Sequence, residues 1–490
     1  MNATDGDRAG ETPLLAALIE LAQRSDAAFH TPGHRRGQGV SPTWATLVGG
    51  ALRGDLPELP ELDNLFAPEG VIQSAQTLAA QAFGSDRTWF LANGSTSGII
   101  AAIAATCGPG DRIALPRNVH QSAIAGLITT GAIPVFMAPD LDPGWGLAHG
   151  VAPATVAQTL AHTPDIKAVL VLHPTYYGVC SDLAAIAAIC HDHGIPLVVD
   201  EAHGAHFAFH PALPPTALAA GADVTVQSTH KTLPALTQAA MLHLQGARVD
   251  PQRLTKALTL VQSTSPNYLL LASLDAARWQ LATTGEALLT QALDLADWAR
   301  SHLATIPGLR VLQPQDLGTP GATWLDRTRL TVAVAALGLD GFTVDERLRT
   351  EFGVVAELPT LQHLTFIITH GNTPTDLERL VQGFNTLATS IPGTASTAQP
   401  ALPDAVPVAT LACSPREAFF APTVTLPWAE AIGCISAELI CPYPPGIPVV
   451  LPGEVISEAA IAYLHQILAH GGIVTGCTDP TLNHLVVLQG

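Results

Sequence analysis

Lys231 is the residue whose surroundings point most strongly to covalent chemistry. It lies in the segment Gln227-Ser228-Thr229-His230-Lys231-Thr232-Leu233, which begins where a predicted strand, 223–227, ends. A lysine amine forms a Schiff base with an aldehyde once its surroundings lower its pKa. Ser228 and His230 beside it can bind a phosphate. Any single lysine is more often an ordinary solvated side chain, so this segment needs independent support.

A carboxylate and a Gly/Ser loop precede Lys231 along the chain. Asp200 ends the apolar run 197–199, and ligands of open α/β sheets bind at that edge. Residues 91–98 follow another predicted strand and open a helix, so backbone N–H groups, Ser95 and Thr96 can cradle a phosphate there. Taken alone, the Asp could cap a turn and the loop could be a plain tight connection.

The order and spacing of these three parts carry the argument. The loop comes first, Asp200 follows about 100 residues later, and Lys231 comes about 30 residues after that. Pyridoxal phosphate needs a phosphate cradle, a carboxylate for its ring nitrogen and a lysine for its aldehyde. The sequence therefore predicts a pyridoxal-phosphate enzyme.

The histidines give a weaker signal. His203 and His206 are spaced as metal ligands can be, and so are His191 and His193, but no third ligand cluster accompanies either pair. We therefore predict no metal site.

The bulk composition excludes several classes of protein. The chain has 490 residues, 13% charged and 48% hydrophobic, with a formal net charge of −19. This composition excludes a disordered chain. The negative net charge argues against a nucleic-acid partner, because neutralising phosphates needs clustered Lys and Arg. The negative net charge is compatible with a cationic substrate, and ordinary solubility also explains it.

Location follows from segments that the sequence lacks. No apolar run approaches the roughly 20 residues of a membrane span, and residues 1–11 do not have the order of a secretory signal. The seven cysteines are scattered, which suits reduced thiols. We expect a cytoplasmic protein with no membrane partner.

The elements that position these residues are expected to form a mostly parallel sheet. Short apolar runs alternate with helical patterns between residues 74 and 246, as in α/β proteins with both sheet faces covered. The predicted strands are 88–92, 112–115, 133–137, 168–172, 197–200 and 223–227, and the predicted helices are 97–106, 119–130 and 182–193.

Five regions are expected along the chain. They are an N-terminal helix (12–24) with an active-site arm (1–70), a large cofactor-binding domain (71–266), a smaller α+β domain (267–390), a Pro-rich linker (391–407) and a C-terminal α+β module (408–490). In the smaller domain we predict a helix from 268 to about 305, a strand at 331–334, a helix at 344–351, a strand at 364–369 and a helix at 375–388.

The chain resembles the Orn/Lys/Arg decarboxylases, which have the aspartate-aminotransferase fold, fold type I. The matching segments, in family order, are Phe29-His30-Thr31-Pro32-Gly33-His34, Asp200-Glu201-Ala202-His203-Gly204-Ala205-His206, Ser228-Thr229-His230-Lys231-Thr232-Leu233, Thr264-Ser265-Pro266, Tyr443-Pro444-Pro445-Gly446-Ile447-Pro448 and Pro452-Gly453-Glu454. They span essentially the whole chain. The lysine and Pro-Pro-Gly segments are specific; the Gly/Ser loop is not. The resemblance implies a sheet of the seven-stranded type in the large domain.

The resemblance also implies catalytic roles. Lys231 would hold the cofactor as a Schiff base, and Asp200 would pair with the protonated ring nitrogen. His120 would stack on the ring and His203 would lie near it.

Further roles follow for binding residues. The implied phosphate ligands are Ser95, Thr96, Ser228 and His230. Thr264 and Ser265 would reach the cofactor site across a dimer interface. Candidate substrate-binding residues are His34, Glu438 and Glu454, the two glutamates for the distal cation.

Three positions depart from the family pattern. Gln121 stands where Lys is common, Cys434 where Arg is usual, and Asn64 where an acidic residue is usual. They bear on substrate choice and assembly rather than on cofactor binding. The chain also resembles a short form, without the N-terminal wing domain of acid-induced relatives.

The implied reaction is decarboxylation of a basic L-amino acid to agmatine, cadaverine or putrescine and CO2, in a homodimer or higher homo-oligomer with shared active sites. Arginine is slightly preferred over lysine and ornithine as the substrate. Two alternatives stay open, since fold does not settle reaction: an aminotransferase or lyase on the same fold, and a catalytically silent regulatory protein.

Overall fold

The computed structural model describes residues 11–390, 409–443 and 446–489. The predicted linker, 391–407, and Pro444-Pro445 of the Pro-Pro-Gly segment lie outside the described residues. The chain divides into two compact units. Unit 1 comprises residues 1–105, 198–211 and 215–288, and unit 2 comprises 106–197, 212–214 and 289–490.

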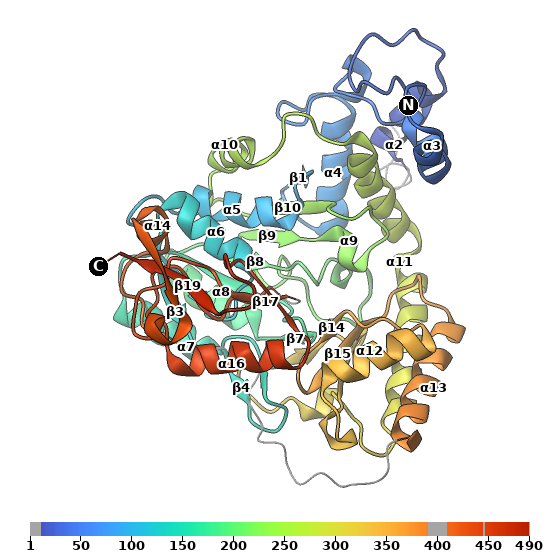
Figure 1. Cartoon of the computed structure of the whole chain (residues 1–490). Coiled ribbons are helices and arrows are strands. Elements are labelled where there is room, and N and C mark those ends of the chain that lie inside the picture. Colours follow the sequence, from blue (N-terminus) through green and yellow to red (C-terminus); the bar gives the residue numbers. More distant parts are fainter. Residues whose placement is uncertain (1–10, 391–408, 444–445, 490) are drawn as a thin grey trace. The chain divides into compact units, whose positions relative to one another are not determined.

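The large sheet has seven strands in the order β1-β10-β9-β8-β6-β2-β3. Figure 1 labels β1, β10, β9 and β8. The strands of this sheet are β1 (Arg87–Leu91), β2 (Arg112–Pro116), β3 (Ile133–Met137), β6 (Ile166–Leu172), β8 (Leu197–Asp200), β9 (Val224–Gln227) and β10 (Ala240–Leu244). β2 is parallel to β3 and β6, and β8 is parallel to β9, whereas β10 is antiparallel to β1 and β9. The six predicted strands are confirmed. β10 was not predicted, because its run Ala-Met-Leu-His-Leu has no β-branched residue and is rich in helix formers.

In unit 1, helix α5 (Gly94–Thr106) begins three residues before the predicted start, because the Gly/Ser loop itself forms the first turn. A Cβ on Gly98 would lie 2.7 Å from side-chain atoms of Leu91 and Val226, so α5 packs closely on β1 and β9. Among the described residues, the other α-helices that begin in this unit are α2 (Pro13–Gln23), α3 (Pro42–Val48), α4 (Val71–Phe83), α9 (Thr229–Thr232), α10 (Pro251–Val261) and α11 (Tyr268–Leu303).

Unit 2 contains helices α6 (Gln121–Thr130), α7 (Pro153–His162) and α8 (Leu183–Asp192) beside its strands of the large sheet. A second, antiparallel sheet has the order β11 (Arg310–Val311), β13 (Arg329–Ala333), β15 (His363–Ile367) and β14 (Leu358–Pro359). With it pack α12 (Gly341–Phe352) and α13 (Pro374–Ser390), around a core that includes Leu330, Leu364 and Phe384. The predicted strands and helices of the smaller domain are confirmed.

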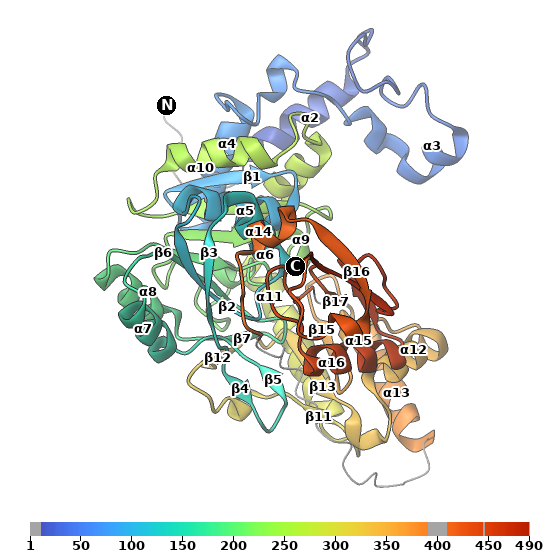
Figure 2. The ribbon, with the colours of Figure 1, turned by 60° about the vertical axis from the view of Figure 1, so that its left-hand side comes forward.

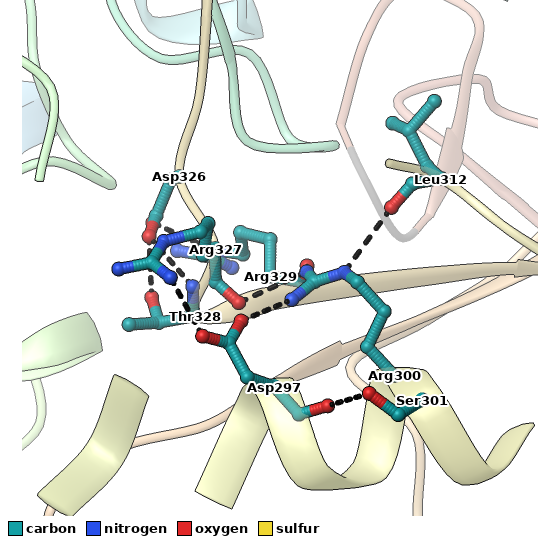
Figure 3. A network of polar contacts seen from close by, with 8 residues as sticks. All are labelled: Asp297, Arg300, Ser301, Leu312, Asp326, Arg327, Thr328 and Arg329. Carbon is teal, nitrogen blue, oxygen red and sulfur yellow. Dashed lines mark hydrogen bonds and ion pairs between the residues drawn. The ribbon is translucent and has the colours of Figure 1, made fainter. Parts of the chain in front are cut away.

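A buried arginine joins the end of α11 to this second sheet (Figure 3). Arg300 donates from Nη2 to the backbone oxygens of Arg327 (2.9 Å) and Arg329 (2.6 Å), and from Nε to that of Leu312 (3.3 Å). Asp297, one turn earlier, accepts from Arg300 Nη1 at 3.2 Å. The guanidinium therefore satisfies carbonyls from two strand segments that would otherwise be buried without donors.

The C-terminal module also belongs to unit 2. Its strands pair as β16 (Thr423–Pro427) with β19 (His484–Leu488) and β17 (Cys441–Tyr443) with β18 (Ile473–Thr475). Its helices are α14 (Pro415–Phe420), α15 (Trp428–Ala431) and α16 (Glu458–Ala469). α14 lies beside α6 in both ribbon views (Figures 1 and 2), and Arg416 donates to the backbone oxygens of Ile128 and Thr129 at the end of α6.

The remaining short strands are β4 (Leu141–Asp142) with β5 (Leu147–Ala148), and β7 (Val179–Cys180) with β12 (Trp324–Leu325). Within the described residues, no helix is both long and apolar enough to cross a bilayer. Nor does that part of the chain group three His, Cys, Asp or Glu side chains as a metal site requires.

Candidate active site

Lys231 and His203 are brought together in unit 1. Lys231 lies in the single-turn helix α9, directly after β9, and is half-buried. Its Nζ is 3.0 Å from Nε2 of His203, which follows β8 and is 4% exposed. Because β8 and β9 are parallel neighbours, their carboxyl ends meet at one sheet edge. The amine can therefore share a proton with the imidazole.

Asp200 is the last residue of β8 and is buried. Burial raises the pKa of its carboxyl group, while the positive charge of Lys231 and a hydrogen bond from the Ala202 backbone N–H (3.1 Å) act in the opposite direction. A cationic group placed against Asp200 would favour the ionised form further. The site thus offers a buried carboxylate suited to a cation.

Two hydroxyls meet at the first turn of α5. Ser228 Oγ donates to Ser95 Oγ at 2.6 Å, and Gly94 has the left-handed φ of +73° with which the chain enters the helix. Thr96, in the same turn, is exposed. His230 is occupied differently, since its Nδ1 lies 2.9 Å from the backbone oxygen of Ala239. The helix N-terminus and hydroxyls have the chemistry of an anion site.

Side chains distant in sequence hold this loop. Both backbone groups of Ala92 are bonded, its N–H to Gln262 Oε1 (2.7 Å) and its carbonyl to Gln238 Nε2 (2.6 Å). Asn93 Oδ1 accepts from the backbone N–H of Ser263 at 3.0 Å. The exposed Thr264 and Ser265 therefore come directly after a residue bonded to the Gly/Ser loop of the same chain.

His120 lies in unit 2 as the N-cap of α6. Its Nδ1 accepts from the Ser122 backbone N–H (3.2 Å) and contacts Ser122 Oγ (2.9 Å). In the neutral ring Nε2 therefore carries the proton. Gln121 N–H donates to the Gly446 carbonyl at 3.0 Å, and a Cβ on Gly446 would lie 3.0 Å from His120 Nε2. The described end of the Pro-Pro-Gly segment thus contacts the predicted stacking histidine.

A buried ion pair supports the same loop. Arg117 donates to both carboxylate oxygens of Glu454, at 3.0 and 2.9 Å, and to the backbone oxygens of Pro448 and Val449. Burial raises the pKa of Glu454, and Arg117 opposes that shift. The sequence segment 117–120 contained this arginine, but nothing local marked its partner more than 300 residues later.

The three predicted substrate-binding residues all have structural contacts. Besides the Arg117 pair, Glu454 accepts from the Leu451 N–H. Glu438 accepts from the backbone N–H groups of Thr478 (2.5 Å) and Val486 (2.9 Å). His34 Nε2 lies 3.0 Å from Asp55 Oδ2. Their substrate roles stay predictions, and these contacts favour structural roles for the two glutamates.

Sequence reasoning missed one buried polar group beside the site. Glu201 is fully buried, and Gln227 and Ala217 donate to its two oxygens at 2.7 Å each. Its place next to Asp200 at the end of an apolar strand was the available signal, since buried carboxylates need partners.

Comparison with known proteins identifies the family. The model of the Orn/Lys/Arg decarboxylase major domain matches residues 12–376, and that of the C-terminal domain of the same family matches residues 406–473. The chain belongs to the Orn/Lys/Arg decarboxylase family. It is a carboxy-lyase that acts on basic amino acids, as the resemblance implied.

Individual relatives agree with this assignment. An arginine decarboxylase of Bacillus subtilis is 40% identical over 483 residues, covering 98% of each chain. A lysine decarboxylase of Pseudomonas aeruginosa is 27% identical and covers 92% of this chain and 75% of the relative. A solved lysine decarboxylase from that organism superposes with a TM-score of 0.82 at 23% identity, over 97% of this chain and 80% of the other. The predicted fold, a fold type I α/β architecture with additional α+β parts, is confirmed.

Proposed function

We propose that this decarboxylase uses pyridoxal 5′-phosphate held by Lys231 and that its substrate is arginine. The observation that carries the cofactor proposal is the cluster in unit 1, where the Lys231 amine, its His203 neighbour and the buried Asp200 carboxylate lie at adjacent strand ends.

The residues present fit the cofactor by their chemistry. Ser95, Ser228 and the N-terminal turn of α5 would hold the phosphate, with Thr96 in the same turn. Asp200 would receive the protonated ring nitrogen, the cation that its buried carboxylate suits. Lys231 supplies the amine for the aldehyde.

When bound, pyridoxal phosphate supplies an electron sink for the electron pair left at Cα as CO2 departs. Asp200 keeps that sink effective by favouring protonation of the ring nitrogen. Lys231 Nζ and His203 Nε2, 3.0 Å apart, can hold between them the proton that Cα needs afterwards. His120, with its proton on Nε2 and Nδ1 tied to Ser122, presents an imidazole of fixed orientation as a stacking partner.

Arginine is proposed because the relatives named arginine decarboxylase are more similar than those named lysine decarboxylase. Four arginine decarboxylases are 38–40% identical to this chain, and three lysine decarboxylases are 23–27% identical. Incubation with arginine, lysine and ornithine in parallel should give agmatine and CO2 fastest from arginine. Cadaverine or putrescine as the main product would contradict the substrate proposal, and keto acids without CO2 would favour an aminotransferase.

Lys231→Ala tests the cofactor proposal. The variant should lose the absorbance band at roughly 420 nm expected of the cofactor bound to a lysine, and nearly all CO2 release. Lys167→Ala and Lys256→Ala, at the two other lysines, both exposed, are the matched controls and should behave as the wild type.

We further propose a cytoplasmic homodimer with shared active sites, in which Thr264 and Ser265 contribute to the partner's cofactor site. The five domain boundaries given above remain part of this proposal. Light scattering should give at least twice the chain mass of 50.9 kDa. A monomer with full activity would contradict shared sites.

A further inference from the structure

A chain of buried hydrogen bonds in unit 1 runs from Glu201, directly after β8, across β9 and β10 to β1. Glu201 Oε2 accepts from Gln227 Nε2 at 2.7 Å, and Gln227 Oε1 lies 3.1 Å from His243 Nε2. His243 Nδ1 lies 2.8 Å from Thr88 Oγ1. The first three side chains are fully buried and Thr88 is 2% exposed. A polar network in this position must be almost completely satisfied to be tolerated.

This hydrogen-bond chain lies on the sheet face opposite Asp200. In the β8–β9 register Asp200 pairs with Val226, whose side chain is directed at Gly98 of α5. Side chains alternate along strands, so Gln227 and Glu201 are directed to the other face. There His243 packs on Phe83 of α4, with ring centroids 4.8 Å apart.

Glu201 itself is fixed from several directions. Its Oε1 accepts from the Ala217 N–H at 2.7 Å, and its own N–H donates to the Val226 carbonyl at 2.9 Å. A Cβ on Gly204 would lie 2.7 Å from Glu201 Cγ, so the following turn closes tightly over the side chain. These contacts leave the carboxyl group one position.

When the Glu201 carboxyl group is ionised, every donor of the hydrogen-bond chain points toward Glu201. A carboxylate only accepts, so the Gln227 amide N–H₂ faces it and the amide oxygen must accept from His243 Nε2–H. Burial lowers the pKa of His243 to about 3, so the ring is neutral and its Nδ1 accepts from the Thr88 hydroxyl. Burial also raises the pKa of Glu201 to about 8. When Glu201 is protonated, its O–H donates to Gln227, and each hydrogen bond from Glu201 to Thr88 runs in the opposite direction.

We propose that Glu201 is a positioning residue for the reaction proposed above: its bond to Gln227 holds together the two strand ends that carry Asp200 and Lys231. Asp200 precedes Glu201 directly, and Ser228 follows Gln227 directly, three residues before Lys231. The inference rests on the proposed function for its catalytic readout. What positions the two groups is the hydrogen bond and not the charge.

Two substitutions distinguish a role of the Glu201 hydrogen bond from a role of the Glu201 charge. Glu201→Leu leaves the Ala217 and Gln227 donors without an acceptor, and kcat should fall by about 10- to 100-fold at temperatures where the variant is folded. Its apparent dissociation constant for pyridoxal phosphate should rise by about 10-fold. Glu201→Gln can keep every hydrogen bond by reversing the chain, so it should retain most of the activity and cofactor affinity.

The matched control is Thr225→Val. Thr225 is fully buried on the same face of β9 as Gln227, and among the described residues its hydroxyl has no hydrogen-bond partner. The Thr225→Val variant should keep the wild-type kcat and cofactor affinity.

The direction of these hydrogen bonds can be measured without an activity assay. At pH 9 the ¹⁵N spectrum of His243, assigned with His243→Gln, should show the Nε2–H tautomer in the wild type and the Nδ1–H tautomer in Glu201→Gln. Equal kcat and cofactor affinity in Glu201→Leu and Thr225→Val would overturn the proposal, as would equal losses in Glu201→Leu and Glu201→Gln. If the wild type neither binds pyridoxal phosphate nor releases CO2, the proposed function fails instead, and the tautomer measurement still tests the chain.

Discussion

The lysine cluster of unit 1 and the His120 loop of unit 2 are held by different kinds of contact. Around Lys231, the supporting residues come from neighbouring strands and from the turns that follow them, as in the Glu201–Gln227 bond between the ends of β8 and β9. Around His120, support comes from Arg117 and from a C-terminal module whose Glu454 is 337 residues beyond Arg117 in sequence.

The difference shows what the C-terminal module contributes to the proposed site. Its Gly446 contacts His120, and its Glu454 neutralises the arginine that lies three residues before that histidine. The contacts around the lysine cluster come from the sheet and from its turns, whereas the His120 loop depends on a second folded region. Variants that damage one support should therefore leave the other intact.

Asp200→Asn should cause the largest loss on the lysine-cluster side. An amide carries no negative charge to favour a protonated ring nitrogen, so kcat should fall by about 10²- to 10³-fold. Steady-state CO2 release measures the effect. A loss below about threefold would show that Asp200 does not face the ring.

Arg117→Met should be the most destabilising change on the His120 side. It leaves Glu454 buried without its cation, which costs about 3–5 kcal/mol. Urea unfolding measures the loss. Arg347→Met, which breaks an exposed pair with Glu351 within α12, is the matched control and should cost at most about 0.5 kcal/mol. Equal effects of the two would remove the argument for a buried support.

Gly446→Ala isolates the contact with His120. The added Cβ meets the imidazole at 3.0 Å and the residue has φ +87°, so kcat should fall by about 10-fold. Gly433 has nearly the same φ, +85°, with nothing within 4 Å of a Cβ, so Gly433→Ala carries the backbone strain alone. An activity loss as large in Gly433→Ala would assign the effect to strain and not to the histidine.

Glu201→Gln should change activity least of these variants, and its main effect is a change in how stability depends on pH. The folded chain holds the Glu201 proton up to a pKa of about 8, above its ordinary value of 4.5, so wild-type stability from this group falls as pH rises between these values. Glutamine does not titrate. The Tm of the variant minus that of the wild type should therefore increase from pH 5 to pH 9. A constant difference would contradict the burial of an ionisable Glu201.

Much of the fold could be predicted because local patterns determine it. Alternating apolar runs and helical patterns identified six strands of the large sheet, and Asp200 and Lys231 could be recognised at strand ends. Strand β10 could not, since its Ala, Met and Leu residues favour a helix and only pairing with β1 and β9 makes it extended.

The supports of the candidate site were harder to predict than its chemistry. Glu454 was expected to recognise substrate because it lies in a family motif, but its partner Arg117 is set by tertiary packing that no local pattern records. The Glu201–Gln227–His243 hydrogen-bond chain likewise depends on strand order, and neither that order nor β10 itself was predicted.

The central claim is that one amine, that of Lys231, holds the cofactor. Borohydride reduction of the protein loaded with pyridoxal phosphate, followed by peptide mass spectrometry, identifies the lysine that was attached to it. The chain has three lysines, and the account predicts the phosphopyridoxyl group on Lys231. Its appearance on Lys167 or Lys256 instead, or on no lysine at all, would contradict the account.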